Sequence, residues 1–423
     1  MSNVDSLFCE FKALLGRLCR DFKDGNNSQN ENAAENVVDA FWSMLNSRFR
    51  MLSIGTGLRA LRVHVLDESA QAVLYCYLNS FIEEPMQPYG GSYFHTRVGM
   101  SAYKKYAPEL AERGLLTATK DSTSEYEYST VRYLLSPRVC SALFKGQEVI
   151  EESSLVAGFG DLIRPEDIIP KDLLFPQEMS ERLELIECAI SKDSEVSIRL
   201  AESKMRSSLT FLFYGPPGCG KTEFVLQIAR RFNRKVIKID AAKLDGSLYG
   251  QQPKRIRAMF LAMQYINSLC EENPLFFLDE CDALLGNRVT VQQAADRESN
   301  LATNTILDEL NTFSGILVAA TNHVKNLDPA MGRRFLMKVE FPLPDIETIA
   351  KIWKNKLPYL TDEQSMELAE EFPVSAGIVD NVLSMSLIIE AVKGEKPSFA
   401  EVVRLCRDQG GNEISKPIKK IGF

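Results

Sequence analysis

Residues 215–222 read Gly-Pro-Pro-Gly-Cys-Gly-Lys-Thr, and this octet has the spacing of a phosphate-binding loop. The apolar run Leu209–Tyr214 precedes it and predicts a buried strand, and Glu223–Phe232 follows with apolar residues at helical spacing. In a strand, loop and helix of this kind, glycines let backbone N–H groups wrap phosphate oxygens, and the helix N-terminus adds its positive dipole. The alternative is a glycine turn that binds nothing, and the flanking elements favour the phosphate loop.

Two residues of the loop and an acidic pair further along the chain have the chemistry of a metal–nucleotide site. We expect Lys221 to reach the outer phosphates and the hydroxyl of Thr222 to bind Mg²⁺. A second apolar strand, Pro274–Leu278, ends in Asp279 and Glu280. Asp279 is expected to support the metal, and Glu280 to polarise the attacking water as a general base. Taken alone, an acidic pair at a strand end is often a solvated turn.

A third predicted strand, Ile316–Ala320, ends in a threonine and Asn322. An amide at this strand tip can orient the attacking water against the γ-phosphate. Further on, Arg333 and Arg334 precede Phe335. Taken alone they indicate a surface helix end, but beside the other elements they predict arginine fingers, which stabilise charge on the γ-phosphate bound to a neighbouring subunit.

With these motifs in place, residues 170–410 resemble the ATPase module of the AAA family, in its narrow sense rather than the wider AAA+ superfamily. The series comprises the octet, Leu-Asp-Glu-Cys-Asp-Ala-Leu-Leu at 278–285, Ala-Ala-Thr-Asn at 319–322, and Leu-Asp-Pro-Ala before the arginine pair. The resemblance implies an α/β fold: a P-loop parallel sheet flanked by helices, followed by a helical lid. It also implies a Mg²⁺-dependent ATPase that binds ATP and Mg²⁺ and forms a homo-oligomeric ring, usually a hexamer, with its sites at subunit interfaces.

The resemblance assigns roles residue by residue. Asp279 and Thr222 would hold the metal, while Glu280, Asn322 and the two arginines would be catalytic. The nucleotide-binding residues would be Gly215, Pro216, Pro217, Gly218, Cys219, Gly220, Lys221, Thr222 and Gly377.

The sequence departs from the family pattern at two places. The turn before the arginines is compressed, which leaves the principal finger open between Arg333 and Arg334 and favours Arg334. This compressed ending resembles a bacterial branch of the family, whose members carry an N-terminal winged-helix-like domain. In the lid, Ile378 replaces the usual acidic residue after the small-residue turn at Gly377.

A candidate pore loop follows the predicted strand Lys235–Asp240. In AAA proteins that thread polypeptides, this loop usually carries an aromatic residue two places before a glycine, and here that place holds Leu248, with Tyr249 next. A bulky apolar tip grips an extended polypeptide without reading its sequence. The alternative is that Leu248 and Tyr249 pack against a helix of their own domain.

The composition of the 423-residue chain limits the remaining functions. A net charge of −8 argues against a general nucleic-acid coat protein, and no apolar run is long enough to span a bilayer. The first residues lack a secretory signal pattern, and the nine cysteines show no C-x-x-C pair, so we expect a cytoplasmic protein with reduced thiols. With three histidines and no ligand spacing, we expect no structural zinc site.

The pattern predicts seven segments. They are an amphipathic helix at 1–25, a polar linker at 26–36, a winged-helix-like domain at 37–150, a linker at 151–176, the large α/β ATPase domain at 177–345, the helical lid at 346–410 and a basic-apolar tail at 411–423. The first helix and the tail each have two interpretations, contact with a partner or packing on the chain's own domain.

The winged-helix prediction rests on the order of elements. Helices are expected from Asp67 through Phe81 and over Ser101–Arg113, then two strands at Leu115–Thr119 and Tyr126–Leu135, with a short helix starting at 135–139. A winged helix suggests DNA, but the basic patch around Lys104 and Lys105 is weak, and the interleaved Tyr103 and Tyr106 are expected to pack. A protein-docking or ring-stabilising role is therefore favoured over DNA binding.

Two finer expectations concern the nucleotide site. The segment Asp167–Ile169 lies where the family skirts the adenine, so it is expected to touch the base. Cys219 lies among inward-facing N–H groups beside Lys221, which would lower the pKa of its thiol, and alkylation of Cys219 is expected to block ATP binding. The alternative for Cys219 is a small residue tolerated at a variable loop position.

These observations favour an ATP-hydrolysing ring motor that remodels or translocates a protein substrate. Such a motor would serve a separately encoded effector, because no second active site is evident, and no membrane role is expected. The alternatives are a DNA-associated ATPase that uses the winged-helix domain and a nucleotide-gated scaffold.

Overall fold

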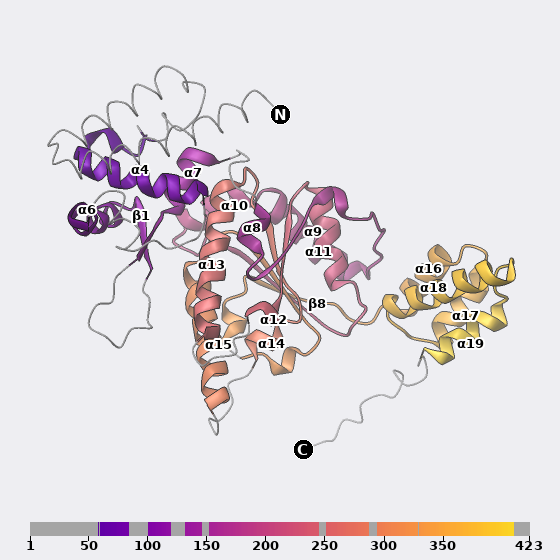
Figure 1. The fold of residues 1–423 in the computed structure, drawn as a ribbon. Coiled ribbons are helices and arrows are strands. Elements are labelled where there is room, and N and C mark those ends of the chain that lie inside the picture. Colours follow the sequence, from indigo (N-terminus) through magenta and orange to yellow (C-terminus); the bar gives the residue numbers. More distant parts are fainter. Residues whose placement is uncertain are drawn as a thin grey trace, which may run out of the picture. The chain divides into compact units, whose positions relative to one another are not determined.

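The computed structural model describes residues 58, 60–83, 100–119, 132–145, 152–244, 251–286, 294–328 and 330–409. The chain forms two compact units, Met1–Ala157 with Leu261–Glu272, and Gly158–Phe260 with Asn273–Phe423. Figure 1 shows the elements. None of the described helices is both long and apolar enough to cross a membrane.

In the described part of the first unit, two helices are followed by an antiparallel ribbon and a short helix, in the order that the sequence predicts, and a further short helix comes after them. Its elements are η1 (Val63–Val65), α4 (Glu68–Glu83), α6 (Met100–Glu112), β1 (Leu116–Thr119), β2 (Arg132–Leu135), α7 (Pro137–Phe144) and α8 (Glu152–Val156). Strand β1 pairs antiparallel with β2, Leu116 opposite Leu135. The start of the second predicted strand, residues 126–131, lies outside the described residues, and the winged-helix assignment stays a prediction.

Local sequence explains how the short helix α7 begins. The hydroxyl of Ser136 accepts a hydrogen bond from the N–H of Val139 and donates one to the carbonyl of Gly114. Pro137 occupies the first helical position, where a missing N–H costs nothing. The ring of Phe81 packs against Phe144 and against Tyr265, so the second half of α13 contributes to this unit's core.

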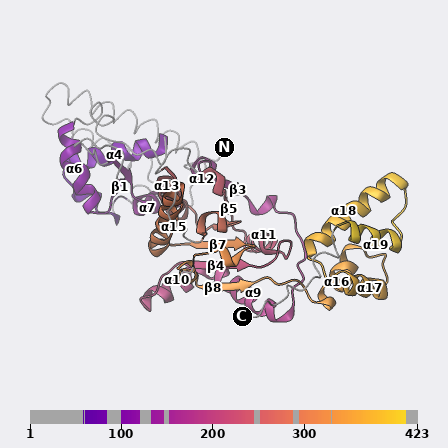
Figure 2. The ribbon, with the colours of Figure 1, turned by 90° about the horizontal axis from the view of Figure 1, so that it is seen from below.

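The second unit is built on a six-stranded sheet in the order β3-β5-β6-β7-β4-β8 (Figure 2). Its strands are β3 (Gly160–Ile163), β4 (Leu209–Tyr214), β5 (Val236–Ile239), β6 (Leu275–Leu278), β7 (Ile316–Thr321) and β8 (Met337–Glu340). Five strands run parallel, as predicted, and the edge strand β3 runs antiparallel to β5. Strand β3 lies in the segment 151–176, where the sequence suggested a linker.

Helices cover both faces of this sheet (Figures 1 and 2). Strand β6 shows how the side chains divide: Leu275 and Phe277 pack in the core with α9 and α11, whereas the ring of Phe276 meets Phe313 at the end of α15. The apolar residues of β6 thus alternate between two buried faces, as expected of a central parallel strand. The helices and 3₁₀ turns are η2 (Pro165–Asp167), α9 (Gln177–Ser191), α10 (Asp193–Glu202), α11 (Lys221–Arg231), α12 (Ala241–Leu244), α13 (Gln251–Leu269), α14 (Asp282–Leu285), α15 (Ala294–Thr312), η3 (Val324–Asn326) and η4 (Met331–Arg333).

The lid is a group of four helices with its own core around Trp353, which is fully buried. The helices are α16 (Ile346–Lys356), α17 (Asp362–Glu371), α18 (Ala376–Lys393) and α19 (Phe399–Asp408). Three of them begin at side-chain caps: Asp345 accepts from the N–H of Thr348, and Thr361 and Ser398 each begin a capping box. The tail at 411–423 and the helix at 1–25 lie outside the described residues.

Candidate nucleotide-binding site

Three neighbouring parallel strands bring the predicted motifs to one edge of the sheet. Tyr214, the last residue of β4, pairs with Thr321 at the end of β7, so the phosphate loop and Asn322 leave the sheet side by side. On the other side of β7, Leu278 of β6 pairs with Ala319, and Asp279 follows directly. This register explains why motifs far apart in sequence meet at the carboxyl edge of the sheet.

The glycines of the phosphate loop occupy positions that other residues would strain. Gly218 and Gly220 have φ angles of +75° and +88°, in the left-handed region. Gly215 lies so close to β8 that a Cβ would stand 2.1 Å from the carbonyl oxygen of Phe341. Glycine here therefore allows the loop to curl tightly at the N-terminus of α11.

Lys221 is held inside the loop by backbone oxygens. Its Nζ donates hydrogen bonds to the carbonyls of Gly215 and Pro216, both at 2.7 Å. Burial lowers the pKa of the Lys221 amine, and Cys219 and Asp279 oppose that shift. Gly215 and Pro216 do not line the nucleotide cavity. Their carbonyl oxygens instead hold the Lys221 amine in place. The remaining residues of the octet line that cavity.

Oxygen ligands suited to Mg²⁺ lie at the start of α11 and the end of β6. The Thr222 hydroxyl donates a hydrogen bond to Oδ2 of Asp279 at 3.1 Å. Hydroxyl and carboxylate oxygens are the ligands that Mg²⁺ prefers. The pair therefore fits a Mg²⁺ ion bound with a nucleotide, as the sequence suggested.

Glu280 and Asn322, the predicted catalytic pair, both line the same cavity and are exposed to solvent. Glu280 has a φ angle of +50°, which is uncommon for a residue with a side chain and often occurs at functional sites. Its N–H donates a hydrogen bond to Oδ1 of Asp279 at 3.1 Å.

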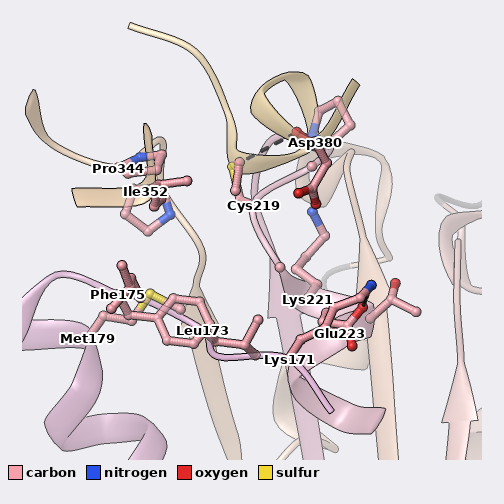
Figure 3. A pocket seen from close by; sticks show the side chains of 18 of the residues that line it. Lys171, Leu173, Phe175, Met179, Cys219, Lys221, Glu223, Pro344, Ile352 and Asp380 are labelled. Carbon is pink, nitrogen blue, oxygen red and sulfur yellow. Dashed lines mark hydrogen bonds and ion pairs between the residues drawn. The ribbon is translucent and has the colours of Figure 1, made fainter. Parts of the chain in front are cut away.

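The cavity has a volume of about 390 Å³, within the range typical of small-molecule sites. In Figure 3 its apolar side chains gather on one side and its charged side chains on the other. The labelled apolar group comprises Leu173, Phe175, Met179, Pro344 and Ile352, and the charged group comprises Lys171, Lys221, Glu223 and Asp380. This division suits a ligand with a flat apolar base at one end and phosphates at the other.

Two ion pairs lie on the charged side of the cavity. Lys171 contacts Glu223 at 2.6 Å, and this hydrogen bond is the main reason that the pKa of Lys171 is raised. From the lid, Lys356 contacts Asp380 at 2.6 Å. None of these four residues is part of a motif visible in the sequence.

The lid also contacts the phosphate loop through small residues. The N–H of Gly377 donates a hydrogen bond to the carbonyl of Gly218 at 3.0 Å. A Cβ on Gly377 would lie 3.0 Å from the Cα of Gly218. The small-residue turn at 375–377 therefore lies against the phosphate loop.

One expectation about this site is wrong: burial raises the pKa of the Cys219 thiol, and the opposing effect of Lys221 is the smaller one. The contact of Asp167–Ile169 with the base stays a prediction, and the described residues that line the cavity begin at Lys171. Ile168 packs in the core of the sheet, and the carbonyl of Ile169 accepts a hydrogen bond from Gln227 at 2.8 Å.

The two arginines lie apart from the nucleotide cavity. Neither Arg333 nor Arg334 is among the lining residues that the structure describes. Arg333 is exposed, whereas Arg334 is half-buried and its carbonyl accepts a hydrogen bond from the Thr210 hydroxyl at 2.8 Å. The predicted pore residues, Leu248 and Tyr249, lie outside the described residues.

Comparison with known proteins agrees with these motifs. Residues 211–343 match the family described as "ATPase family associated with various cellular activities (AAA)". The 26S proteasome regulatory subunit 4 homolog of Dictyostelium discoideum is 29% identical over 205 residues, which cover 47% of this chain and 44% of that protein. A probable 26S proteasome regulatory subunit 6B of Caenorhabditis elegans is 34% identical over 207 residues, with the same two coverages. The chain thus spans just under half the length of these relatives.

Among solved structures, a chain of the E. coli MS115-1 HORMA:CdnC:Trip13 complex covers 60% of this chain and 96% of its own length, with a TM-score of 0.48 and 18% identity. The matched family region begins inside β4 and ends after β8, so it includes the phosphate loop, Asp279 and Glu280, Asn322 and both arginines. Residues 211–343 are therefore similar to the ATPase domain of the AAA family.

Proposed function

We propose that this chain is an ATP-hydrolysing ring motor that remodels or translocates a protein substrate. The observation that carries the proposal is the single cavity that collects Lys221, Thr222, Asp279, Glu280 and Asn322 from three strand ends. Such a set can bind a metal–nucleotide complex and direct a water molecule at its terminal phosphate.

Each side chain has a role that follows from its position. The Lys221 amine would bind the outer phosphates, and Thr222 and Asp279 would hold Mg²⁺, which supplies charge neutralisation when bound. The Glu280 carboxylate would accept the proton of the attacking water, which the Asn322 amide would orient. The lid would exclude bulk water by closing the base side of the cavity.

The position of the two arginines favours a site shared between copies. Guanidinium groups that stabilise a γ-phosphate must reach it, yet Arg333 and Arg334 do not line the cavity of their own chain. A neighbouring copy in a ring would supply them. The proteasome regulatory subunits among the relatives support a protein substrate and a separately encoded effector as the working proposal.

The DNA-associated alternative finds less support in the described part of the first unit. Lys104 and Lys105 are exposed, but Lys105 donates a hydrogen bond to the hydroxyl of Tyr106 at 2.8 Å. Tyr103 and Tyr106 are both buried, as the sequence predicted, so their rings offer no stacking surface to bases. The described residues of the first unit therefore favour a protein substrate over DNA.

The ATPase part is tested by Glu280→Gln in the full chain. We expect hydrolysis to fall by about 100-fold or more, while a fluorescent ATP analogue still binds in MgCl₂. A shared site is tested by mixing Glu280→Gln with an inactive arginine variant, Arg333→Ala or Arg334→Ala. Recovery of activity on mixing would mean that Glu280 of one copy works with an arginine of another copy. If neither mixture recovers activity, the proposal of a site shared between copies is contradicted.

Protein remodelling is tested through the steady-state ATPase rate. Stimulation by an unfolded polypeptide, lost in a Leu248→Ala/Tyr249→Ala double variant, is the expected result. Stimulation by DNA alone would replace protein remodelling with the DNA-associated alternative. No response to either would favour the nucleotide-gated scaffold.

A further inference from the structure

A second cavity lies behind the acidic pair of the nucleotide site. It has a volume of about 690 Å³ and shares Asp279 and Glu280 with the first cavity. Its other walls come from β5, the start of α12 and α14, with one residue each from β3 and α13. Among its lining residues that the structure describes, Lys238 is the one with a positively charged side chain.

Lys238 contacts the carboxylate that the proposed function assigns to the metal. Its Nζ lies 3.7 Å from Oδ2 of Asp279, the same oxygen that accepts the hydrogen bond of Thr222. The other oxygen, Oδ1, accepts the N–H of Glu280. The Asp279 carboxylate is therefore held by a hydroxyl, an amide and an ammonium group.

The sheet register fixes this arrangement. Lys238 pairs with Phe277 across β5 and β6, and Asp279 comes two residues after Phe277. The lysine therefore approaches the carboxylate from β5, through the second cavity, whereas Thr222 approaches it from α11. A cation on β5 is consequently close to any metal ion that Thr222 and Asp279 hold.

We infer that Lys238 is a positioning residue that holds Asp279 in the metal-free site and opposes Mg²⁺ there, an inference that rests on the proposed nucleotide site. Like charges repel, so the ammonium group weakens Mg²⁺ binding, while it attracts the phosphates of a metal-free nucleotide. Both effects reduce the gain in nucleotide affinity that Mg²⁺ produces. Because the Lys238 side chain is 44% exposed, solvent and salt screen the effect to a modest size.

The experiment measures the dissociation constant of a fluorescent ATP analogue on the full chain, once in EDTA and once in MgCl₂. The dissociation constant in EDTA divided by that in MgCl₂ measures how much the metal strengthens nucleotide binding. Association of Mg²⁺ with the nucleotide in solution contributes equally for every variant. Lys238→Met should raise this ratio by about threefold to tenfold at low salt, and less at high salt.

Two variants serve as controls. Lys238→Arg keeps the charge and should leave the ratio near that of the wild-type chain. Lys243→Met removes a charge nearby, but Lys243 pairs with Asp161 at 2.9 Å and not with Asp279, so its ratio should also stay unchanged. Equal melting temperatures of the variants would show that each one folds.

The outcomes separate the two proposals. A ratio in Lys238→Met that equals or falls below the wild-type ratio, with nucleotide still bound, overturns the inference and leaves the ATPase proposal intact. A wild-type chain that binds no nucleotide in either buffer overturns the ATPase proposal and the inference with it.

Discussion

Gly218 offers a sharp test of how the lid closes on the phosphate loop. In Gly218→Ala, the new Cβ would stand 2.5 Å from the Ser375 hydroxyl and 3.3 Å from the backbone of Gly377. The matched control is Gly394→Ala, because Gly394 has nearly the same φ angle, +77° against +75°, and nothing within 4 Å of the added Cβ. The two variants share backbone strain and differ in the collision with the lid.

The expected loss of affinity follows from the backbone strain and from the collision with the lid. Left-handed backbone at an alanine costs about 1–2 kcal/mol, which both variants incur. In Gly218→Ala the lid turn must also move away, at about 1–3 kcal/mol, the usual cost of overpacking. Because the lid closes one side of the nucleotide cavity, we expect Gly218→Ala to weaken nucleotide binding by about tenfold to a hundredfold, and Gly394→Ala to leave it unchanged.

Fluorescence titration of an ATP analogue in MgCl₂ measures the effect, and Ser375→Ala provides a rescue. The Ser375 side chain makes no capping hydrogen bond at the start of α18, so its removal alone should cost little. The double variant Gly218→Ala/Ser375→Ala should recover most of the lost affinity. A double variant no better than Gly218→Ala, or equal losses in Gly218→Ala and Gly394→Ala, would refute the reasoning.

Three further predictions follow from burial. Because burial raises the pKa of the Cys219 thiol, its thiolate is scarce at mildly alkaline pH. Iodoacetamide should therefore label the exposed Cys188 before Cys219 in peptide mass mapping. The ion pair of Asp193 with Arg234 is buried, so Asp193→Ala should lower the free energy of unfolding by about 3–5 kcal/mol in a denaturant titration. The control Arg199→Ala breaks an exposed ion pair and should lower it by less than about 1 kcal/mol. Burial lowers the pKa of Lys221 in the nucleotide-free chain, and bound phosphates would raise that pKa. Nucleotide affinity should therefore be greatest at pH values below the lowered pKa and should fall as the pH rises through it. Binding titrations up to pH 10.5 measure this loss.

The sequence predicts where the motifs of the phosphate side lie, because each motif follows an apolar strand. Asp279, Glu280 and Asn322 lie immediately after β6 and β7, and parallel strands place their carboxyl ends at one edge. A short stretch of sequence therefore determines the strand, the motif after it and the place of the motif's side chains. The glycine loop adds backbone requirements that few other sequences meet.

The other residues that line the cavity show no comparable signal in the sequence. Lys171 and Phe175 come from an irregular segment before α9, and Asp380 comes from α18 in the lid, so only tertiary packing brings them together. Strand β3 escapes prediction for a similar reason: it has four residues and a charged one among them, and its pairing with β5 defines it. The raised pKa of Cys219 likewise depends on burial, which neighbouring residues in the sequence do not reveal.

In the proposed ring, the two arginines would connect the nucleotide site to assembly. Neither Arg333 nor Arg334 lines the cavity of its own chain, so a neighbouring copy would supply the arginine that the proposed hydrolysis needs. The half-buried Arg334 is anchored through its carbonyl to Thr210 on β4, the strand that leads directly into the phosphate loop. In a ring, a displacement of β4 as nucleotide is bound or lost would therefore move the arginine offered to the next copy. This linkage gives the mixed-variant experiment a second readout: Thr210→Val, which removes the hydrogen bond to Arg334, should impair hydrolysis in the neighbouring copy more than nucleotide binding in its own.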